Sequence, residues 1–290
     1  MTETCEFNLN CHTDKRELFS KNGFQIVECC KCHHRYAEVT EIENHVATVY
    51  SDSYFFDGKA GYPNYLSEKE LLIASGKRYS EIVSKYTTPG NLLDVGCAAG
   101  FIMNGFEMAG WKCDGIEPNE FMADYGRNEL KLKISTSDLE GFKSDKKYDL
   151  ICLIQVLGHF YDIHKAMYNL TDLLKEDGFV LVESWNMNSS IARFLGKRWH
   201  EYSPPSVLHW FSDLTITQLF RRMNLKFVAS GYPIKKINLK HAISLLNEHM
   251  PDFVFKKELF EKIDLFAGNL TVIYPLHDLK WYLFKKQIII

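Results

Sequence analysis

The sequence lacks the features of several protein classes. Only 8 of its 290 residues are proline and 17 are glycine, while 46% are hydrophobic, which excludes collagen-like and wholly disordered chains. Its 34 basic residues do not outnumber its 37 acidic ones, so no overall positive field recruits nucleic acid. The longest apolar run, residues 150–158, is far shorter than the roughly 20 residues of a membrane-spanning helix.

The chain also begins without the pattern of a secretory signal. Its first residues, MTETCEFN, contain Glu3 and Glu6 and neither a basic nor an apolar region. We therefore expect a cytoplasmic protein with no transmembrane segment. A length of 290 residues fits one α/β domain with appendages as well as it fits two domains.

The cysteines are concentrated at the amino-terminal end, where five of the eight lie within the first 32 residues. In a reducing compartment, clustered thiols hold a metal more often than they form disulfides. Cys29 and Cys32 form a Cys-x-x-Cys pair after a short predicted strand at 25–28, and Cys5 and Cys11 form a second pair with a wider spacing. The pattern predicts structural zinc on these four cysteines, in a ribbon-like module spanning residues 1–45.

The zinc hypothesis leaves alternatives open. His12, Cys30, His33 and His34 are further donors, so the ligand set is ambiguous. A ribbon that has lost its metal and packs as a small apolar flap, or a redox role for the thiols, fits the same residues.

From residue 91 onward, short apolar runs alternate with amphipathic stretches. This alternation is typical of βαβ units, whose right-handed crossovers produce a parallel sheet covered on both faces. The sequence therefore predicts an α/β, doubly wound fold. The expected strands lie at residues 91–95, 111–117, 130–134, 148–156, 179–185, 225–230 and 269–274.

The segment LLDVGCAAGF, residues 92–101, joins a buried strand to a glycine turn that opens a helix. Such a turn lets the backbone approach a ligand at the carboxyl end of the strand. The dinucleotide pattern G-x-G-x-x-G fails, because Ala98 and Phe101 stand where its second and third glycines are required. Glu117 ends the next strand within reach of a ribose diol, so we expect a ligand that contains a nucleoside.

These residues resemble the class I S-adenosylmethionine-dependent methyltransferases, more narrowly the bacterial small-molecule group with a cysteine-rich amino-terminal ribbon. LLDVGCAAGFIMNGFEMAGWKCDGIEPN is similar to the first two motifs of that family, and YDLICLIQVLGHFYD, LLKEDGFVLVESWNMNSSIARFLGKRW and NLTVIYPL to its fourth, fifth and closing antiparallel strands. The resemblance spans residues 25–277. It implies a Rossmann-like, mostly parallel seven-stranded sheet with an antiparallel last strand, and S-adenosyl-L-methionine as the cofactor.

The resemblance also implies a domain organisation. The ribbon-like module at 1–45 is followed by an aromatic helical segment at 46–89 that covers the cofactor. The methyltransferase domain spans 90–277 and includes a largely helical insertion at 232–268. An apolar and basic tail, 278–290, ends the chain; it either docks on its own domain or a second subunit, or lies at a membrane interface.

In this family the cofactor would be held at the carboxyl edge of the sheet. Asp94 and Gly96 would lie under the methionine, Glu117 would hold the ribose, and Asp138 would approach the adenine. Gln155 and Val156 would face the methyl group. The full set of cofactor-binding residues that the resemblance implies is Tyr54, Tyr65, Asp94, Gly96, Cys97, Gly100, Glu117, Pro118, Asp138, Leu139, Gln155 and Val156, with Tyr62 as a further covering tyrosine. Asp138 as a solvated loop acid, and the tyrosines as ordinary packing, remain alternatives.

An acceptor that must lose a proton needs a general base. Histidine suits this role because its pKa lies near neutrality. His159 directly follows the fourth strand, where the family commonly has histidine, and His209 lies in a segment that caps the acceptor pocket. The sequence departs from the family pattern at Val207, where a histidine is often found. His159 and His209 are therefore the candidate catalytic residues, with His200, an ordering role for His159, or no base at all as alternatives.

An aromatic set follows the fifth strand and either walls the acceptor pocket or belongs to the core. Its members are Trp185, Trp199, Tyr202, Trp210 and Phe211.

The resemblance thus predicts methyl transfer to a small molecule such as a sugar, a nucleotide sugar or a quinone-like ring, by a monomer or homodimer. An RNA base methyltransferase and a non-catalytic, cofactor-binding interaction module remain the alternatives.

Overall fold

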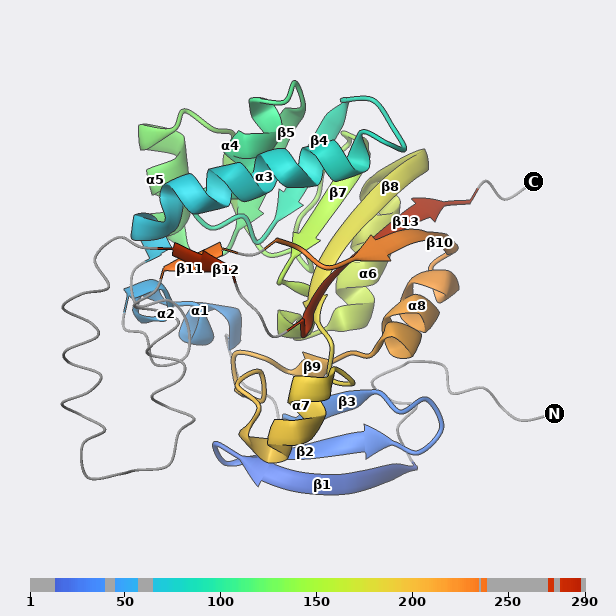
Figure 1. The fold of residues 1–290 in the computed structure, drawn as a ribbon. Coiled ribbons are helices and arrows are strands. Elements are labelled where there is room, and N and C mark those ends of the chain that lie inside the picture. Colours follow the sequence, from blue (N-terminus) through green and yellow to red (C-terminus); the bar gives the residue numbers. More distant parts are fainter. Residues whose placement is uncertain are drawn as a thin grey trace.

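The computed structural model describes residues 14–39, 45–56, 65–234, 236–238, 271–273 and 277–287. Two sheets dominate this part of the chain, a seven-stranded mixed sheet and a four-stranded antiparallel sheet (Figure 1). Cys5, Cys11, Tyr62 and most of the predicted insertion at 232–268 lie outside the described residues.

The seven-stranded sheet confirms the predicted Rossmann-like fold. Its strand order is β10-β13-β8-β7-β4-β5-β6, and the pairs from β8 to β6 are parallel. Its strands are β4 (Asn91–Val95), β5 (Lys112–Glu117), β6 (Ile134–Thr136), β7 (Tyr148–Ile154), β8 (Leu174–Trp185), β10 (Leu225–Gly231) and β13 (Leu279–Lys286).

The closing antiparallel strand is not the segment that the sequence predicted. β13 pairs antiparallel with both β8 and β10, whereas Thr271–Ile273 is β12 and pairs with β11 (Lys236–Asn238). The segment 269–274 does contain a strand, but its predicted place as the closing strand of the large sheet was wrong, and most of the predicted tail lies inside that sheet. Leu279, Leu283 and Phe284 are buried there, which accounts for the apolar character that had suggested a membrane-surface tail.

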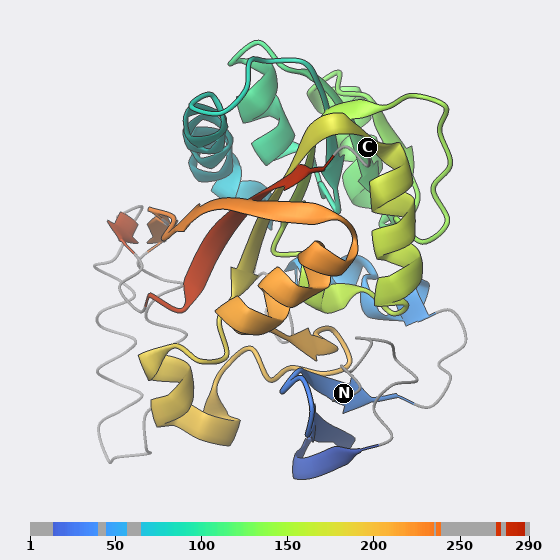
Figure 2. The same ribbon diagram turned by 90° about the vertical axis from the view of Figure 1, so that its right-hand side faces the viewer.

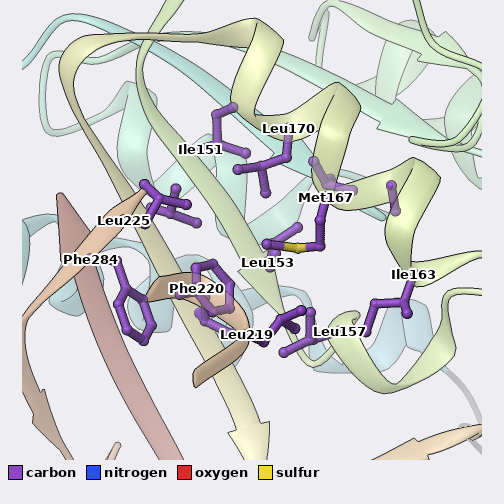
Figure 3. Packing of buried hydrophobic residues seen from close by; sticks show 14 of the residues in the cluster. Ile151, Leu153, Leu157, Ile163, Met167, Leu170, Leu219, Phe220, Leu225 and Phe284 are labelled. Atoms are coloured by element: carbon purple, nitrogen blue, oxygen red, sulfur yellow. The ribbon is translucent and has the colours of Figure 1, made fainter. Parts of the chain in front are cut away.

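Helices cover both faces of the sheet. α3 (Lys69–Val83), α4 (Phe101–Glu107) and α5 (Glu120–Glu129) pack on one face, and α6 (Ile163–Leu173) and α8 (Asp213–Arg222) pack on the other. Figure 3 shows the second layer, where Ile151 and Leu153 of β7 meet Met167 of α6 and Phe220 of α8. The carboxyl ends of the parallel strands remain uncovered by these helices.

The four-stranded sheet joins the two halves of the chain. β1 (Lys15–Lys21), β2 (Phe24–Cys29) and β3 (Arg35–Glu38) form an antiparallel meander, to which β9 (His209–Trp210) adds a fourth strand. The β1–β2 turn has positive φ at Asn22 (51°) and Gly23 (85°), as a tight hairpin turn requires. Because β9 lies between β8 and α8 in the chain, its pairing with β3 attaches the amino-terminal meander to the segment that follows β8 of the large sheet.

Short elements occupy the side to which the carboxyl ends of the parallel strands point (Figures 1 and 2). They are α1 (His45–Val49), α2 (Asp52–Phe56), η1 (Tyr65–Glu68), η2 (Leu157–His159), α7 (Ser190–Leu195) and η3 (Gly196–Arg198). Among the helices of the described ranges, none is both long and apolar enough to cross a membrane.

Candidate active site

The turn after β4 is shaped by two glycines. Gly96 has φ +64°, and a Cβ there would lie 2.8 Å from the Cγ2 atom of Val156. Gly100 has φ +76° and precedes α4. The Gly96 and Cys97 amides donate to the Ile116 carbonyl at 2.8 and 3.1 Å, which ties the turn to β5. Because Gly96 and Gly100 have no side chains, the backbone of the turn can come close to a ligand at the carboxyl edge of the sheet.

Two carboxylates are buried beside this turn. Asp94 and Glu117 are each 3% exposed. Glu117 accepts hydrogen bonds from the amides of Ala98 and Asn119, both at 2.8 Å. Burial raises the pKa of Glu117 to about 7, and burial together with the neighbouring Glu117 charge raises the pKa of Asp94 to about 7. Such a pair suits a ligand that offers hydroxyl donors and a positive charge.

The aromatic segment at 45–56 lies over these carboxylates. The Asn119 side chain donates to the Tyr50 carbonyl at 3.0 Å, and the Tyr50 hydroxyl donates to the Ser206 carbonyl at 2.7 Å. Burial, with the nearby charges of Glu201 and Glu117, raises the pKa of Tyr54. Tyr54 therefore lies close enough to Glu117 for the charge of this carboxylate to act on its hydroxyl.

Tyr65 has a different setting from Tyr54. Its ring is buried and stacks on Phe101 of α4, with centroids 5.5 Å apart and an interplanar angle of 7°. Tyr65 thus packs against the first residue of α4.

Gln155 and Val156 follow β7 directly beside the glycine turn. Gln155 has φ +58°, its amide donates to the Glu183 carbonyl at 2.9 Å, and its side chain donates to the Glu183 carboxylate at 2.9 Å. The Tyr79 hydroxyl donates to the same carboxylate. Glu183 and Tyr79 were missed from the sequence, although a glutamate near the end of the apolar strand FVLVESW is a signal that could have found Glu183.

The loop after β6 lies next to the Glu117 end of β5. The Ser137 amide donates to the Glu117 carbonyl at 3.1 Å, and Pro118 follows Glu117 on the other side. Asp138 accepts from the Gly141 amide at 2.6 Å, which stabilises a turn, and Leu139 is buried. The structure therefore brings Asp138 and Leu139 to the same edge as Glu117.

His159 lies beneath the aromatic segment. Its Nδ1 atom is 2.6 Å from the Ser206 carbonyl and 3.1 Å from the Tyr50 hydroxyl. Burial lowers the pKa of His159, while the carbonyls of Ser206 and Gln155 favour its protonated form. A neutral ring that gives its Nδ1 hydrogen to Ser206 keeps its lone pair on Nε2, and the carbonyls would stabilise the imidazolium formed on taking up a proton.

His209 lies in the junction between the two sheets. It is a β9 residue, it is buried, and its Nδ1 atom lies 3.1 Å from the Nε2 atom of His34. His200 lies elsewhere, with its ring 4.8 Å from that of Trp185 and its Nε2 atom 3.5 Å from the Glu201 carboxylate. The structure therefore does not bring His159, His200 and His209 into one hydrogen-bonded group.

Most of the predicted aromatic wall is core. Trp199, Tyr202, Trp210 and Phe211 are buried, and the first three pack in a cluster with Ile26 of the amino-terminal sheet. Trp185, at the end of β8, is partly exposed and packs against that cluster. Of the five residues, Trp185 is thus the one that is not fully buried.

The predicted zinc ligands are only half described. Cys29 and Cys32 are buried at the end of β2 and in the turn that follows, where the His33 amide donates to the Cys29 carbonyl at 2.9 Å. Over the described ranges, no three His, Cys, Asp or Glu side chains are grouped as a metal site. Cys5 and Cys11 lie outside those ranges.

Comparisons with known proteins agree with this geometry. A sequence model of the family described as "Methyltransferase domain" matches residues 68–230. A ubiquinone biosynthesis O-methyltransferase from Rickettsia bellii is 25% identical over 128 residues, which cover 39% of this chain and 53% of that protein. The chain therefore spans about half the length of the curated relatives that it matches first.

Solved structures share the fold at low sequence identity. A possible histamine N-methyltransferase from Thermotoga maritima matches with a TM-score of 0.51 at 14% identity, over 77% of this chain and 93% of that one. A magnesium protoporphyrin IX methyltransferase from Synechocystis matches with a TM-score of 0.50 at 12% identity, over 84% of this chain and 93% of that one.

Proposed function

This chain belongs to the methyltransferase-domain family of S-adenosylmethionine-dependent enzymes. From that premise we propose that it methylates a small-molecule acceptor. The observation that carries the proposal is the pair of buried carboxylates, Asp94 and Glu117, beside the glycine turn at Gly96. A buried, partly ionised pair is costly unless a ligand with hydroxyls and positive charge offsets it.

The residues at the carboxyl edge fit S-adenosyl-L-methionine. Glu117 would hold the ribose hydroxyls, and Asp94 with the 96–100 backbone would hold the methionine end. Asp138 and Leu139, in the loop beside Glu117, would meet the adenine. Gln155 and Val156 would face the methyl group, with Gln155 held in place by Glu183. When bound, the cofactor supplies a methyl group that is already activated by its sulfonium.

The chain's own groups would position the acceptor and take up its proton. We assign proton uptake to the Nε2 atom of His159, since Ser206 orients the ring through Nδ1. The acceptor hydroxyl would lose its proton to Nε2 while its oxygen forms the new bond to carbon and the sulfonium bond breaks. Tyr50 and Tyr54 would exclude water from this step by covering the edge of the sheet.

A hydroxyl on a ring is the acceptor chemistry that we favour. The curated relatives are named as ubiquinone biosynthesis O-methyltransferases, and one structural neighbour is a magnesium protoporphyrin IX methyltransferase. The partly exposed Trp185 offers a flat apolar face next to His200 for such a ring. The net charge of −3 gives no support to a nucleic-acid acceptor.

Structural zinc in the amino-terminal module remains part of the proposal. The buried Cys29 and Cys32 supply half of a four-thiolate site, and Cys5 and Cys11 would supply the rest. Elemental analysis of the purified full chain should give one zinc per chain, and at most half of it after substitution of Cys29 and Cys32 by serine.

Label transfer tests the proposed function. The full chain is incubated with methyl-labelled S-adenosylmethionine and fractionated small-molecule extracts, and products are identified by mass spectrometry. We expect a labelled small molecule whose formation an excess of S-adenosylhomocysteine suppresses. No labelled product from any fraction, with cofactor binding intact, would favour a non-catalytic relative instead.

A further inference from the structure

His45 is a buried side chain that the catalytic proposal does not use. It is the first residue of α1 and is 3% exposed. Neither of its ring nitrogens has a hydrogen-bond partner among the residues that the structure describes. Its recorded ring neighbours are Tyr161, at 5.1 Å between centroids, and Tyr50, at 6.5 Å. A buried imidazole left in this state loses its hydrogen bonds to water without replacing them, so a ligand that restores one is favoured.

The ring lies against the loop that follows β7, and that loop is bonded to the loop that follows β6. Its neighbour Tyr161 comes two residues after His159, and the Tyr161 amide lies 3.2 Å from the Glu140 carboxylate, to which it donates. Glu140 directly follows Asp138 and Leu139. His45 also lies close enough to His159 for its charge to lower the His159 pKa. Through Tyr161 and Glu140, His45 is thus linked to the loop of Asp138 and Leu139, where the proposed function puts the adenine.

α1 is fixed at this place by contacts from the site itself. Asn119 donates from its side chain to the Tyr50 carbonyl and to Asp52, both at 3.0 Å, while its own amide donates to Glu117. The Tyr50 hydroxyl adds the bond to Ser206. Asn119 thus joins the residues that directly follow α1 to the carboxylate that would hold the ribose.

We propose that His45 recognises the adenine of S-adenosylmethionine, with one ring nitrogen accepting a hydrogen bond from the 6-amino group. This inference rests on the proposed function. Burial lowers the pKa of His45, so the ring is neutral near pH 7 and carries one lone-pair nitrogen. His45 is then a residue that determines specificity for the cofactor and takes no part in the transfer step.

Calorimetric titration with S-adenosylhomocysteine tests this contact in the full chain. The His45→Phe variant keeps an aromatic ring of similar size and removes both nitrogens. We expect it to bind S-adenosylhomocysteine about five- to tenfold more weakly than wild type, as the loss of one buried hydrogen bond predicts. The ligand-free variant should melt at the same temperature as wild type or higher, because an unsatisfied polar group has been removed. Tyr168→Phe, which removes a polar group from an exposed ring on α6, is the control and should bind as wild type does.

A second ligand measures how much the 6-amino group contributes to the affinity. The analogue of S-adenosylhomocysteine that has hydrogen in place of this group should bind wild type more weakly, and the penalty should shrink several-fold in His45→Phe. His45→Gln, which restores an acceptor, should recover part of the discrimination and serves if the Phe variant does not fold. Equal affinities of wild type and His45→Phe, with an unchanged penalty for the analogue, would overturn the inference alone. Failure of wild type to bind S-adenosylhomocysteine would overturn the proposed function as well.

Discussion

Burial sets the charge state of the individual residues at this site. Asp94 and Glu117 have pKa values raised to about 7, and His159 has a lowered pKa, all through removal from water. The carboxylates thus ionise near neutral pH, while the histidine stays neutral and able to take up a proton. Near neutral pH these shifts therefore supply partly ionised carboxylates and a neutral histidine, the states that the proposed chemistry needs.

The two carboxylates predict how cofactor affinity depends on pH. Below about pH 7 Asp94 and Glu117 are largely protonated and neutral, and above it they are ionised. S-adenosylmethionine carries a sulfonium charge that S-adenosylhomocysteine lacks, so its relative affinity should rise by roughly fivefold between about pH 6 and about pH 8. Calorimetry with both ligands across this range measures the ratio. Asp94→Asn should flatten the dependence, and a ratio that falls with pH would contradict this assignment.

The two candidate histidines should respond differently to substitution. With the acceptor fraction found by label transfer, His159→Asn should lower the transfer rate about a hundredfold or more, while S-adenosylhomocysteine affinity stays within about twofold. His209→Asn loses the contact to His34 and should lower the free energy of unfolding by about 1 kcal/mol with transfer largely kept. Full activity of His159→Asn would remove this residue as the base.

Among the elements, the turn after β4 depends most directly on residue type. Gly96 needs a positive φ and also has no room for a Cβ beside Val156, whereas Gly23 needs the same kind of φ in open space. The two glycines therefore separate the cost of backbone strain from the cost of a clash.

Alanine at these two positions should measure the difference. Gly23→Ala should cost about 1 kcal/mol of unfolding free energy, and Gly96→Ala about 2 kcal/mol or more because the methyl group meets Val156. Gly96→Ala should also weaken S-adenosylhomocysteine binding at least severalfold, which Gly23→Ala should not. Denaturant unfolding and calorimetry give both quantities. Equal costs at the two positions would show that the turn has room for a side chain.

The amino-terminal sheet depends on a partly buried ion pair. Glu28 accepts from Arg16 and Arg35 at 2.7 Å each, and Arg35 also donates to Tyr202 from the segment before β9. Glu28→Ala leaves Arg35 without its carboxylate and should lower the unfolding free energy by about 2 kcal/mol. Lys15→Ala, in the exposed pair with Glu38, should change it by less than about 0.5 kcal/mol. A cost for Lys15→Ala as large as that for Glu28→Ala would contradict this ranking.

For the whole molecule, the sequence predicted the large sheet because β4, β7 and the second half of β8 are short, mostly apolar runs that are largely buried, separated by amphipathic stretches. It failed at the closing strand, since 269–274 and 279–286 both have strand character. Only the long antiparallel register with β8 and β10 selects β13.

The sequence likewise predicted only part of the site. Asp94, Gly96 and Glu117 lie in local motifs, and the structure brings them together. The roles of His45, Tyr79 and Glu183 could not be predicted, because they depend on contacts with residues far away in the sequence. The Tyr79–Glu183 contact, for example, joins residues 104 positions apart. The pairing of β3 with β9 likewise involves only two residues of β9, too few for a periodic signal.

The central claim is that the carboxyl edge around Glu117 binds the cofactor of methyl transfer. Calorimetric titration of the full chain with S-adenosylhomocysteine tests it most directly, with Glu117→Ala as the site variant and Glu129→Ala, at an exposed position on α5, as its matched control. The account predicts one bound molecule per chain in wild type and Glu129→Ala, and severely weakened binding in Glu117→Ala. Absence of heat with either S-adenosylmethionine or S-adenosylhomocysteine, together with binding of a nicotinamide dinucleotide, would contradict it.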